Sequence, residues 1–191
     1  MTRFLLALCG VVALAVLPAA AQTPAPKSAP ADKPAAAGKS PMVMITMEKG
    51  GEIVLELWPQ DAPKHVENFV RLVNEKFYDG QRVHRVEPKF VVQFGDPQSK
   101  TLPLDDPRMG TGGTGRKLKA EFNKRPFERG VLGMARANDP DSADSQVYLM
   151  LGPAEFLNGK YTAFGRVVTG MGVVDQIRVG DRIKSVKVVT K

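Results

Sequence analysis

A basic side chain, an aromatic ring and an amide lie within nine residues of one another, at Arg85, Phe90 and Gln93. A guanidinium is always charged and offers its donors in a rigid fork, and an amide both donates and accepts hydrogen bonds. Such groups could hold a polypeptide backbone beside an apolar slot. Taken singly, each has an ordinary alternative: Arg85 could be a surface arginine paired with an acid, Gln93 a polar residue at the end of a sheet, and Phe90 a core residue.

Other chemistries that the sequence suggests lack the context they need. Two histidines and one cysteine provide too few nitrogen and sulfur ligands for a zinc site. Ser145 is not in the tight elbow that a serine hydrolase requires. His84 follows a β pattern, which predicts that it faces away from Arg85 and is structural, and His65 is expected on the solvated side of a helix.

A glycine-rich stretch from Gly110 to Gly115 satisfies the pattern G-x-G-x-x-G. A dinucleotide site needs this pattern between a strand and a helix. Here a loop rich in Pro and Asp precedes it, and no convincing helix follows. We therefore expect a loop that borders the substrate groove.

The overall composition of the 191-residue chain is that of a globular protein, with 43% apolar and 25% charged residues. A single cysteine excludes an intramolecular disulfide bond. The formal net charge is +7, but no basic run with interleaved aromatic residues appears, so nucleic acid is not an expected partner.

The first 41 residues differ in composition from the rest of the chain. Residues 1–21 combine a basic start, an apolar run and small residues before a cleavage site, which is typical of a signal peptide. A lipoprotein cleavage site at Cys9 is the alternative. Residues 22–41 consist mostly of Ala, Pro, Lys, Ser and Thr and are expected to form a flexible linker. A globular domain is expected from residue 42 to residue 191.

Residues 42–191 show the patterns of many short strands and two helices. Apolar residues alternate with polar ones on both sides of Lys49-Gly50-Gly51, which predicts a β-hairpin. Pro63 suits the first turn of a helix, and a second helix is expected at 171–178. Further strands are expected at 82–86, 90–93, 131–135, 146–150, 162–168 and 184–189. We predict a mainly β fold, a closed eight-stranded antiparallel barrel capped by two α-helices.

The segment from Tyr78 to Gly95 resembles the active-site strands of the cyclophilins, which are peptidyl-prolyl cis–trans isomerases. Further blocks that resemble this family follow in order and at similar spacing: Gly110–Gly113, Gly133–Arg136, Asp144–Gln146, Phe156–Tyr161 and Phe164-Gly165. The resemblance covers essentially the whole domain and is closest to the exported bacterial type.

The resemblance implies an isomerase that forms no covalent intermediate and uses no metal or other cofactor. It assigns catalysis to Arg85. It assigns substrate binding to Phe90, Val91, Gln93, Ala135, Arg136, Gln146, Tyr148, Phe156, Leu157 and Tyr161. Val91, Tyr148, Phe156 and Tyr161 depart from residues common elsewhere in the family, and Glu87 stands where an aliphatic residue is usual.

Rotation about an X–Pro bond meets a barrier of about 18–20 kcal/mol, because amide resonance must be broken. No bond is made or cut, so a site needs a slot for the proline ring, a strong donor and contacts that hold the flanking backbone. Arg85 could bond the prolyl nitrogen or the carbonyl oxygen of the proline residue. The expected substrates are proline-containing unfolded or flexible polypeptides. The protein itself is expected to be a periplasmic monomer that assists the folding of exported proteins. The alternative function is a peptide-binding chaperone or scaffold that isomerises poorly.

Overall fold

The β-hairpin predicted at the start of the domain is present in the computed structural model, which describes residues 40–189. Strand β1 (Met42–Met47) pairs with β2 (Glu52–Leu57), and Gly50 and Gly51 form the turn with φ angles of 95° and 94°. The predicted leader, with Cys9, and nearly all of the predicted linker lie outside the described residues.

Helix α1 (Pro63–Asn74) begins at the proline that the sequence analysis placed in its first turn. Its apolar face packs into the main core through Val66, Phe69 and Leu72. His65 lies on this buried face and is fully buried, so the prediction that it is solvated is wrong. The physical reason is a partner distant in sequence: Glu121 accepts a hydrogen bond from the His65 ring at 2.6 Å.

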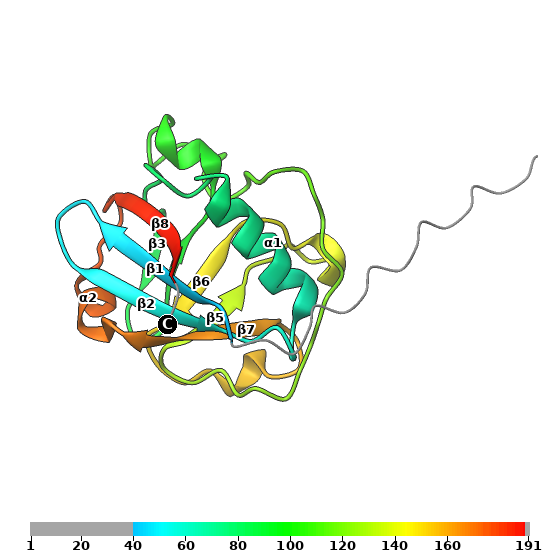
Figure 1. The fold of residues 1–191 in the computed structure, drawn as a ribbon. Helices are drawn as coiled ribbons and strands as arrows, with labels where there is room; N and C mark the ends of the chain where they lie inside the picture. Colours follow the sequence, from blue (N-terminus) through cyan, green and yellow to red (C-terminus); the bar gives the residue numbers. More distant parts are fainter. Residues whose placement is uncertain (1–39, 190–191) are drawn as a thin grey trace, which may run out of the picture. The chain divides into compact units, whose positions relative to one another are not determined.

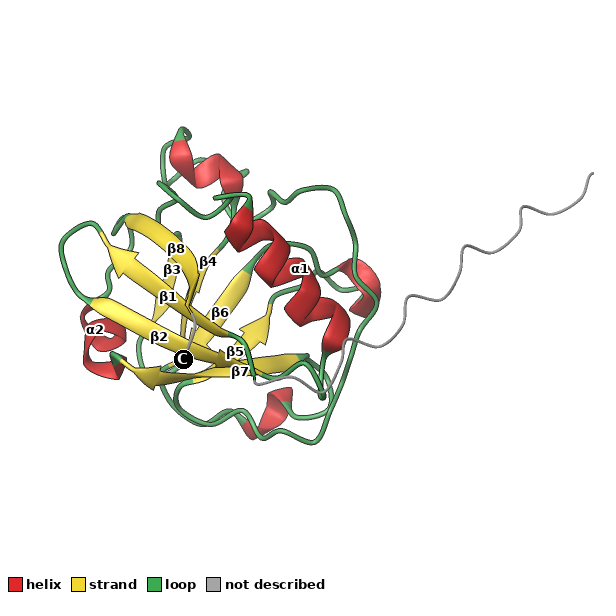
Figure 2. Cartoon of the chain, in the orientation of Figure 1, coloured by secondary structure: helices red, strands yellow, loops and turns green. Residues whose placement is uncertain are grey.

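The remaining strands complete one antiparallel sheet in the order β3-β4-β6-β5-β7-β2-β1-β8. Figure 1 shows this sheet curled strongly on itself, with α1 and α2 at opposite ends of it, and Figure 2 shows the same elements coloured by type. The bounds of these elements are β3 Arg85–Glu87, β4 Val91–Phe94, β5 Val131–Met134, β6 Val147–Met150, β7 Ala163–Thr169, α2 Met171–Gln176 and β8 Ile183–Val189. Three short 3₁₀ helices, at Pro97–Lys100, Pro140–Ser142 and Glu155–Leu157, lie in the loops.

The eight strands, the two α-helices and the barrel-like curvature confirm the predicted fold, but the barrel is not strictly closed. The edge strands β3 and β8 do not pair along their length. Instead, residues 80–83 and 180–183 exchange backbone hydrogen bonds, with Arg82 opposite Arg182 in an isolated bridge. A short contact therefore joins the two edges where a continuous ladder was expected.

Two apolar clusters lie on opposite faces of the sheet. The main core fills its inside and includes Val92, Val147 and Leu149. A second cluster on the outside includes Val91 and Tyr148, which come from the same two strands. Because both faces of β4 and β6 are apolar, period-2 alternation in the sequence could not show which residues face outward.

Candidate active site

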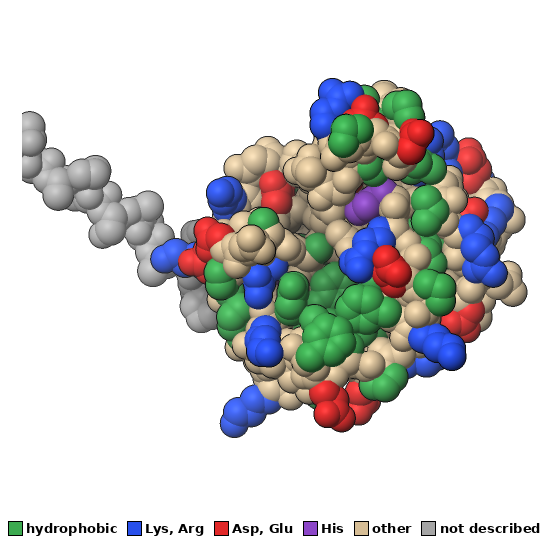
Figure 3. All heavy atoms as spheres, turned by 180° about the vertical axis from the view of Figure 1, so that it is seen from behind, with side chains coloured by type: hydrophobic (Ala, Val, Ile, Leu, Met, Phe, Trp, Pro, Cys, Tyr) green, Lys and Arg blue, Asp and Glu red, His purple; other side chains and the backbone are tan. Residues whose placement is uncertain are grey.

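A cleft of about 720 Å³ opens over the outer cluster, on the face formed by β3, β4, β6 and β5. Figure 3 shows a hollow on this face where hydrophobic side chains gather, with basic and acidic side chains at its edge. Every residue predicted for the site lines this cleft except Gln146, which lies in the adjoining pocket. The structure thus brings together residues that lie up to 76 positions apart in the sequence.

The apolar part of the cleft is a slot with buried walls and an exposed rim. Val91, Tyr148 and Leu157 are 2%, 5% and 6% exposed and belong to the outer cluster. Phe90 and Phe156 lie at the rim with their ring centroids 5.6 Å apart, and Phe156 is 63% exposed. An exposed aromatic ring beside a preformed apolar slot is suited to a small apolar ring such as that of proline.

Arg85 lies at the edge of this slot and is held by two side chains of the protein. Its Nη1 donates to Gln93 Oε1 at 3.1 Å, and its Nε lies 3.5 Å from Glu87 Oε1. The guanidinium carbon is 5.8 Å from the centroid of the Phe90 ring. These contacts fix a half-exposed cation next to the place where an apolar group would bind.

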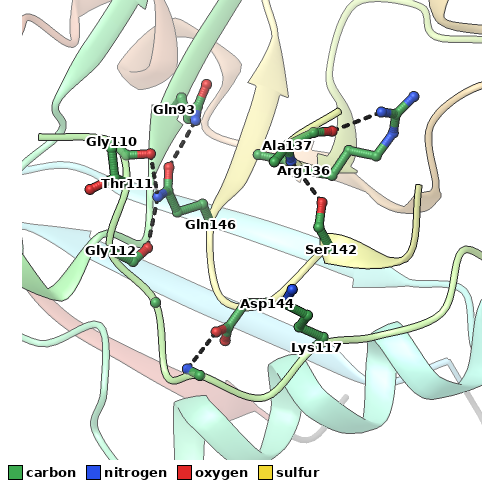
Figure 4. A pocket seen from close by; sticks show the side chains of 13 residues that line it. Gln93, Gly110, Thr111, Gly112, Lys117, Arg136, Ala137, Ser142, Asp144 and Gln146 are labelled. Carbon is green, nitrogen blue, oxygen red and sulfur yellow. Dashed lines mark hydrogen bonds between the residues drawn. The ribbon is translucent and has the colours of Figure 1, made fainter. Parts of the chain in front are cut away.

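Gln93 is in turn hydrogen-bonded to Gln146. The Gln93 amide donates to Gln146 Oε1 at 3.0 Å, and Gln146 Nε2 donates to the carbonyl oxygens of Gly110 and Gly112, both at 2.8 Å. Figure 4 shows these bonds as a continuous chain from Gln93 to the glycine-rich loop. The predicted location of this loop, beside the groove, agrees with the geometry, since Gly110 lines both pockets.

A buried carboxylate, that of Asp96, anchors the glycine-rich loop. Asp96 is fully buried and accepts hydrogen bonds from the backbone N–H groups of Gln98, Gly110 and Gly112, at 2.8, 2.6 and 3.2 Å. Gly95 precedes it with φ of 106°, and a Cβ there would lie 2.4 Å from the Ser145 carbonyl oxygen. Only glycine allows the chain to turn from β4 into this anchor.

On the other side of the cleft, the Arg136 side chain makes its contacts within the protein. It donates to the carbonyl oxygens of Lys160, Ala137 and Asn138 and lies 4.4 Å from the centroid of the Tyr161 ring. The rest of this wall is the backbone around Ala135, whose N–H donates to the Gln146 carbonyl oxygen at 2.9 Å.

The adjoining pocket has a volume of about 580 Å³ and shares Gln93, Ala135 and Arg136 with the cleft. Lys117 and Asp144 also line it, as Figure 4 shows. Asp144 accepts from the Gly115 N–H at 2.7 Å, which holds the far end of the glycine-rich loop. A peptide in the cleft therefore has a second hollow beside it.

His84 lines the cleft beside Arg85, so the prediction that it faces away is wrong. Strand β3 begins only at Arg85, and the alternation of a strand does not extend to the preceding residue. Burial lowers the pKa of the His84 ring, and the nearby Asp96 carboxylate opposes this shift.

Part of the rim comes from the loop between β4 and β5, and no pattern in the sequence predicted it. Leu104, Pro107 and Met109 line the cleft, together with Asp106. The sequence signal was present in the long Pro- and Asp-rich loop, but a loop without periodicity does not indicate which of its side chains face a groove.

The chemistry of the cleft is that of a cation and several amides around an apolar slot. Among residues 40–189, no three His, Cys, Asp or Glu side chains form a group that could hold a metal ion. Within the same residues, no helix has the length and apolar character needed to cross a membrane. The arrangement can bind an apolar ring and place positive charge beside it, without a covalent step.

Comparisons with known proteins agree with this geometry. A family model described as cyclophilin type peptidyl-prolyl cis-trans isomerase/CLD matches residues 42–191. A probable peptidyl-prolyl cis-trans isomerase of Brucella suis is 46% identical over 140 residues, covering 72% of this chain and 71% of that protein. Peptidyl-prolyl cis-trans isomerase B of Bacillus subtilis is 40% identical over 144 residues, covering 74% and 94%. A cyclophilin type isomerase of Cryptosporidium parvum has a similar crystal structure, with a TM-score of 0.69, 24% identity and coverage of 80% and 99%.

Proposed function

This chain belongs to the family of cyclophilin-type peptidyl-prolyl cis–trans isomerases, and we propose that Arg85 is the electrostatic catalyst of its reaction. The proline ring of the substrate occupies the slot of Val91, Tyr148 and Leu157. The observation that carries this proposal is the position of Arg85, which is held at the edge of that slot by Gln93 and Glu87.

The reaction requires stabilisation of a twisted amide, whose nitrogen gains a lone pair as resonance is lost. Only contacts that are stronger in this twisted state than in the planar one accelerate the rotation. A guanidinium N–H directed at the prolyl nitrogen is such a contact, because the planar amide nitrogen is a poor acceptor. Arg85 Nη2 has no hydrogen-bond partner within residues 40–189, so we assign this donor to the substrate.

Backbone contacts are assigned to the polar part of the cleft. Gln93 and the backbone at Ala135 and Arg136 hold the residues that flank the proline, while Gln146 keeps Gln93 in place. Phe156 and Tyr161 cover the rim. Holding both flanks limits the motion to the bond that rotates, which is the benefit of a preorganised site.

The test is the catalysed isomerisation of an X–Pro peptide by wild type and by Arg85→Ala, followed in a protease-coupled assay. Removal of one donor that acts on developing charge typically lowers turnover about 10²–10³-fold, and we expect a loss of that order. Arg166→Ala is the matched control, since Arg166 is an equally charged residue on β7 that pairs with Glu56, and it should retain wild-type turnover. Unchanged turnover in Arg85→Ala would refute the assignment.

The alternative is a peptide-binding chaperone that uses the same cleft but isomerises poorly. It predicts that wild type binds the peptide without raising the rate above the spontaneous one. The same assay therefore distinguishes the two functions before any variant is made.

We further propose that the protein is exported to the periplasm, where a monomer assists the folding of proline-containing exported proteins. The support is the composition of residues 1–21, which has the features of a signal peptide, and of the following linker. Mass spectrometry of the N-terminus after cell fractionation tests this. A periplasmic protein that begins near residue 22 is expected, and an intact Met1 in the cytoplasm would overturn the proposal.

A further inference from the structure

Glu87 places a carboxylate at the rim of the slot, beside the arginine to which we assign catalysis. Arg85 and Glu87 are two residues apart in β3, so their side chains lie on the same face of the strand. The register with β4 sets Arg85 opposite Gln93 and Glu87 opposite Val91, a wall of the slot. Cross-strand neighbours of this kind have Cβ atoms about 4.5–5.5 Å apart.

The other charges of the cleft are compensated in different ways. Asp106 lines the cleft, but Arg108 donates two hydrogen bonds to its carboxylate, at 2.9 and 2.7 Å. Arg136, on the opposite wall, contacts carbonyl oxygens and the Tyr161 ring. Within residues 40–189, the one charged partner of Glu87 is Arg85 at 3.5 Å, and the Glu87 side chain is 51% exposed, so its charge is available to a bound peptide.

The Arg85–Glu87 pair makes this part of the rim neutral in net charge. Without Glu87, the half-exposed guanidinium of Arg85 would attract acidic substrate residues to the same place. With Glu87, an acidic residue that approaches the rim meets a carboxylate, and a basic residue gains a partner. The carboxylate therefore offsets a charge preference that Arg85 alone would impose.

We propose that Glu87 is a specificity-determining residue, which shifts the preference of the site toward Lys or Arg and away from Asp or Glu on one flank of the proline, relative to the preference that Arg85 alone would impose. The inference deepens the proposed function and rests on it, because it takes the slot as the proline site. Exposed ion pairs contribute little to the free energy of binding, so the effect on the relative turnover of basic and acidic substrates is about two- to fivefold. It should vanish at about 1 M salt, where charges farther apart than about 3 Å are screened.

The experiment uses peptides of equal length that carry Lys or Glu either directly after the proline or two positions before it. The measured quantity is the ratio of kcat/KM for the Lys peptide to that for the Glu peptide, at low salt. Glu87→Gln keeps the size of the side chain and removes its charge. We expect the ratio at one of the two positions to fall about two- to fivefold in Glu87→Gln relative to wild type.

The matched control is Glu67→Gln, which makes the same change in net charge. Glu67 is an exposed residue of α1 that pairs with Lys64 and does not line the cleft. Its ratios should equal those of wild type. Equal ratios in wild type and Glu87→Gln at both positions overturn the inference, as does the same change in Glu67→Gln. A wild type that accelerates none of the peptides contradicts instead the proposed function.

Discussion

Loss of the Glu121 carboxylate should destabilise the fold strongly, although this residue lies in a loop. Glu121 accepts hydrogen bonds from the backbone N–H groups of Lys64 and His65, at 3.0 and 2.9 Å, and from the ring of His65 at 2.6 Å. The N-cap residue of α1, Ala62, has no side chain that could replace it. Glu121 thus provides the cap of α1 from a position 56 residues later in the chain.

The size of the effect follows from these bonds. Replacement of a helix cap by Ala costs about 0.5–2 kcal/mol. A buried donor left without a partner costs about 1–3 kcal/mol, and the fully buried His65 ring would be in that position. Glu121→Ala should therefore lower the free energy of unfolding by about 2–4 kcal/mol. For a domain of this size, each kcal/mol corresponds to a fall in Tm of about 2–4 °C.

The same carboxylate should make stability depend on pH. Burial alone would raise the pKa of Glu121, but hydrogen bonds from the His65 ring and from the N–H groups of Lys64 and His65 hold it below its ordinary value of 4.5. A pKa lower in the folded than in the unfolded state stabilises the fold above the unfolded value, and this stabilisation is lost as the pH falls through the folded value. The advantage of wild type over Glu121→Gln should thus be full at pH 6 and shrink below pH 4.5.

Urea unfolding at several pH values measures both effects. Glu67→Ala serves as the control, because Glu67 lies on the same helix with a side chain that is 62% exposed, and it should change stability by less than about 0.5 kcal/mol. The reasoning is refuted if Glu121→Ala costs no more than the control, or if the advantage of wild type over Glu121→Gln does not change with pH.

Three further substitutions test the site itself. Tyr148→Phe should leave stability unchanged or raise it by up to about 1 kcal/mol in urea unfolding, because the buried Tyr148 hydroxyl has no partner within residues 40–189; a loss above 1 kcal/mol would contradict this. Gly133→Ala should lower the free energy of unfolding by about 1–3 kcal/mol and raise KM, since the added Cβ would lie 2.4 Å from the Tyr148 ring. A wild-type free energy of unfolding and a wild-type KM would show that the ring moves freely. Gln146→Ala should lower kcat/KM about two- to tenfold in the peptide assay, because Gln93 loses an acceptor worth about 0.5–1.5 kcal/mol, and full activity would mean that Gln93 needs no support.

The parts of the fold that the sequence predicted well are those with local signals. Alternation around Gly50 and Gly51 and the proline at residue 63 placed the hairpin and α1 correctly, because strand pairing across a tight turn and helix initiation depend on neighbouring residues. The ordered blocks of the family resemblance likewise identified residues that line one cleft.

The errors concern contacts between distant segments. His65 was expected in solvent because its helix pattern contains no information about Glu121. His84 was placed on the wrong face because the strand predicted from residue 82 begins only at Arg85. The loop from Pro97 to Gly110 contributes Leu104 and Met109 to the rim, and no periodicity marks them. These features depend on tertiary contacts, which override local preference.

The central claim is that Arg85 acts on the twisted amide and not merely on peptide binding. NMR exchange measurements on an X–Pro peptide give both its Kd and the rate at which cis and trans forms interconvert on the enzyme. For Arg85→Ala, the account predicts an interconversion rate lowered about 10²–10³-fold with Kd changed only severalfold. A Kd weakened by that same factor, with the interconversion rate on the enzyme unchanged, would contradict it.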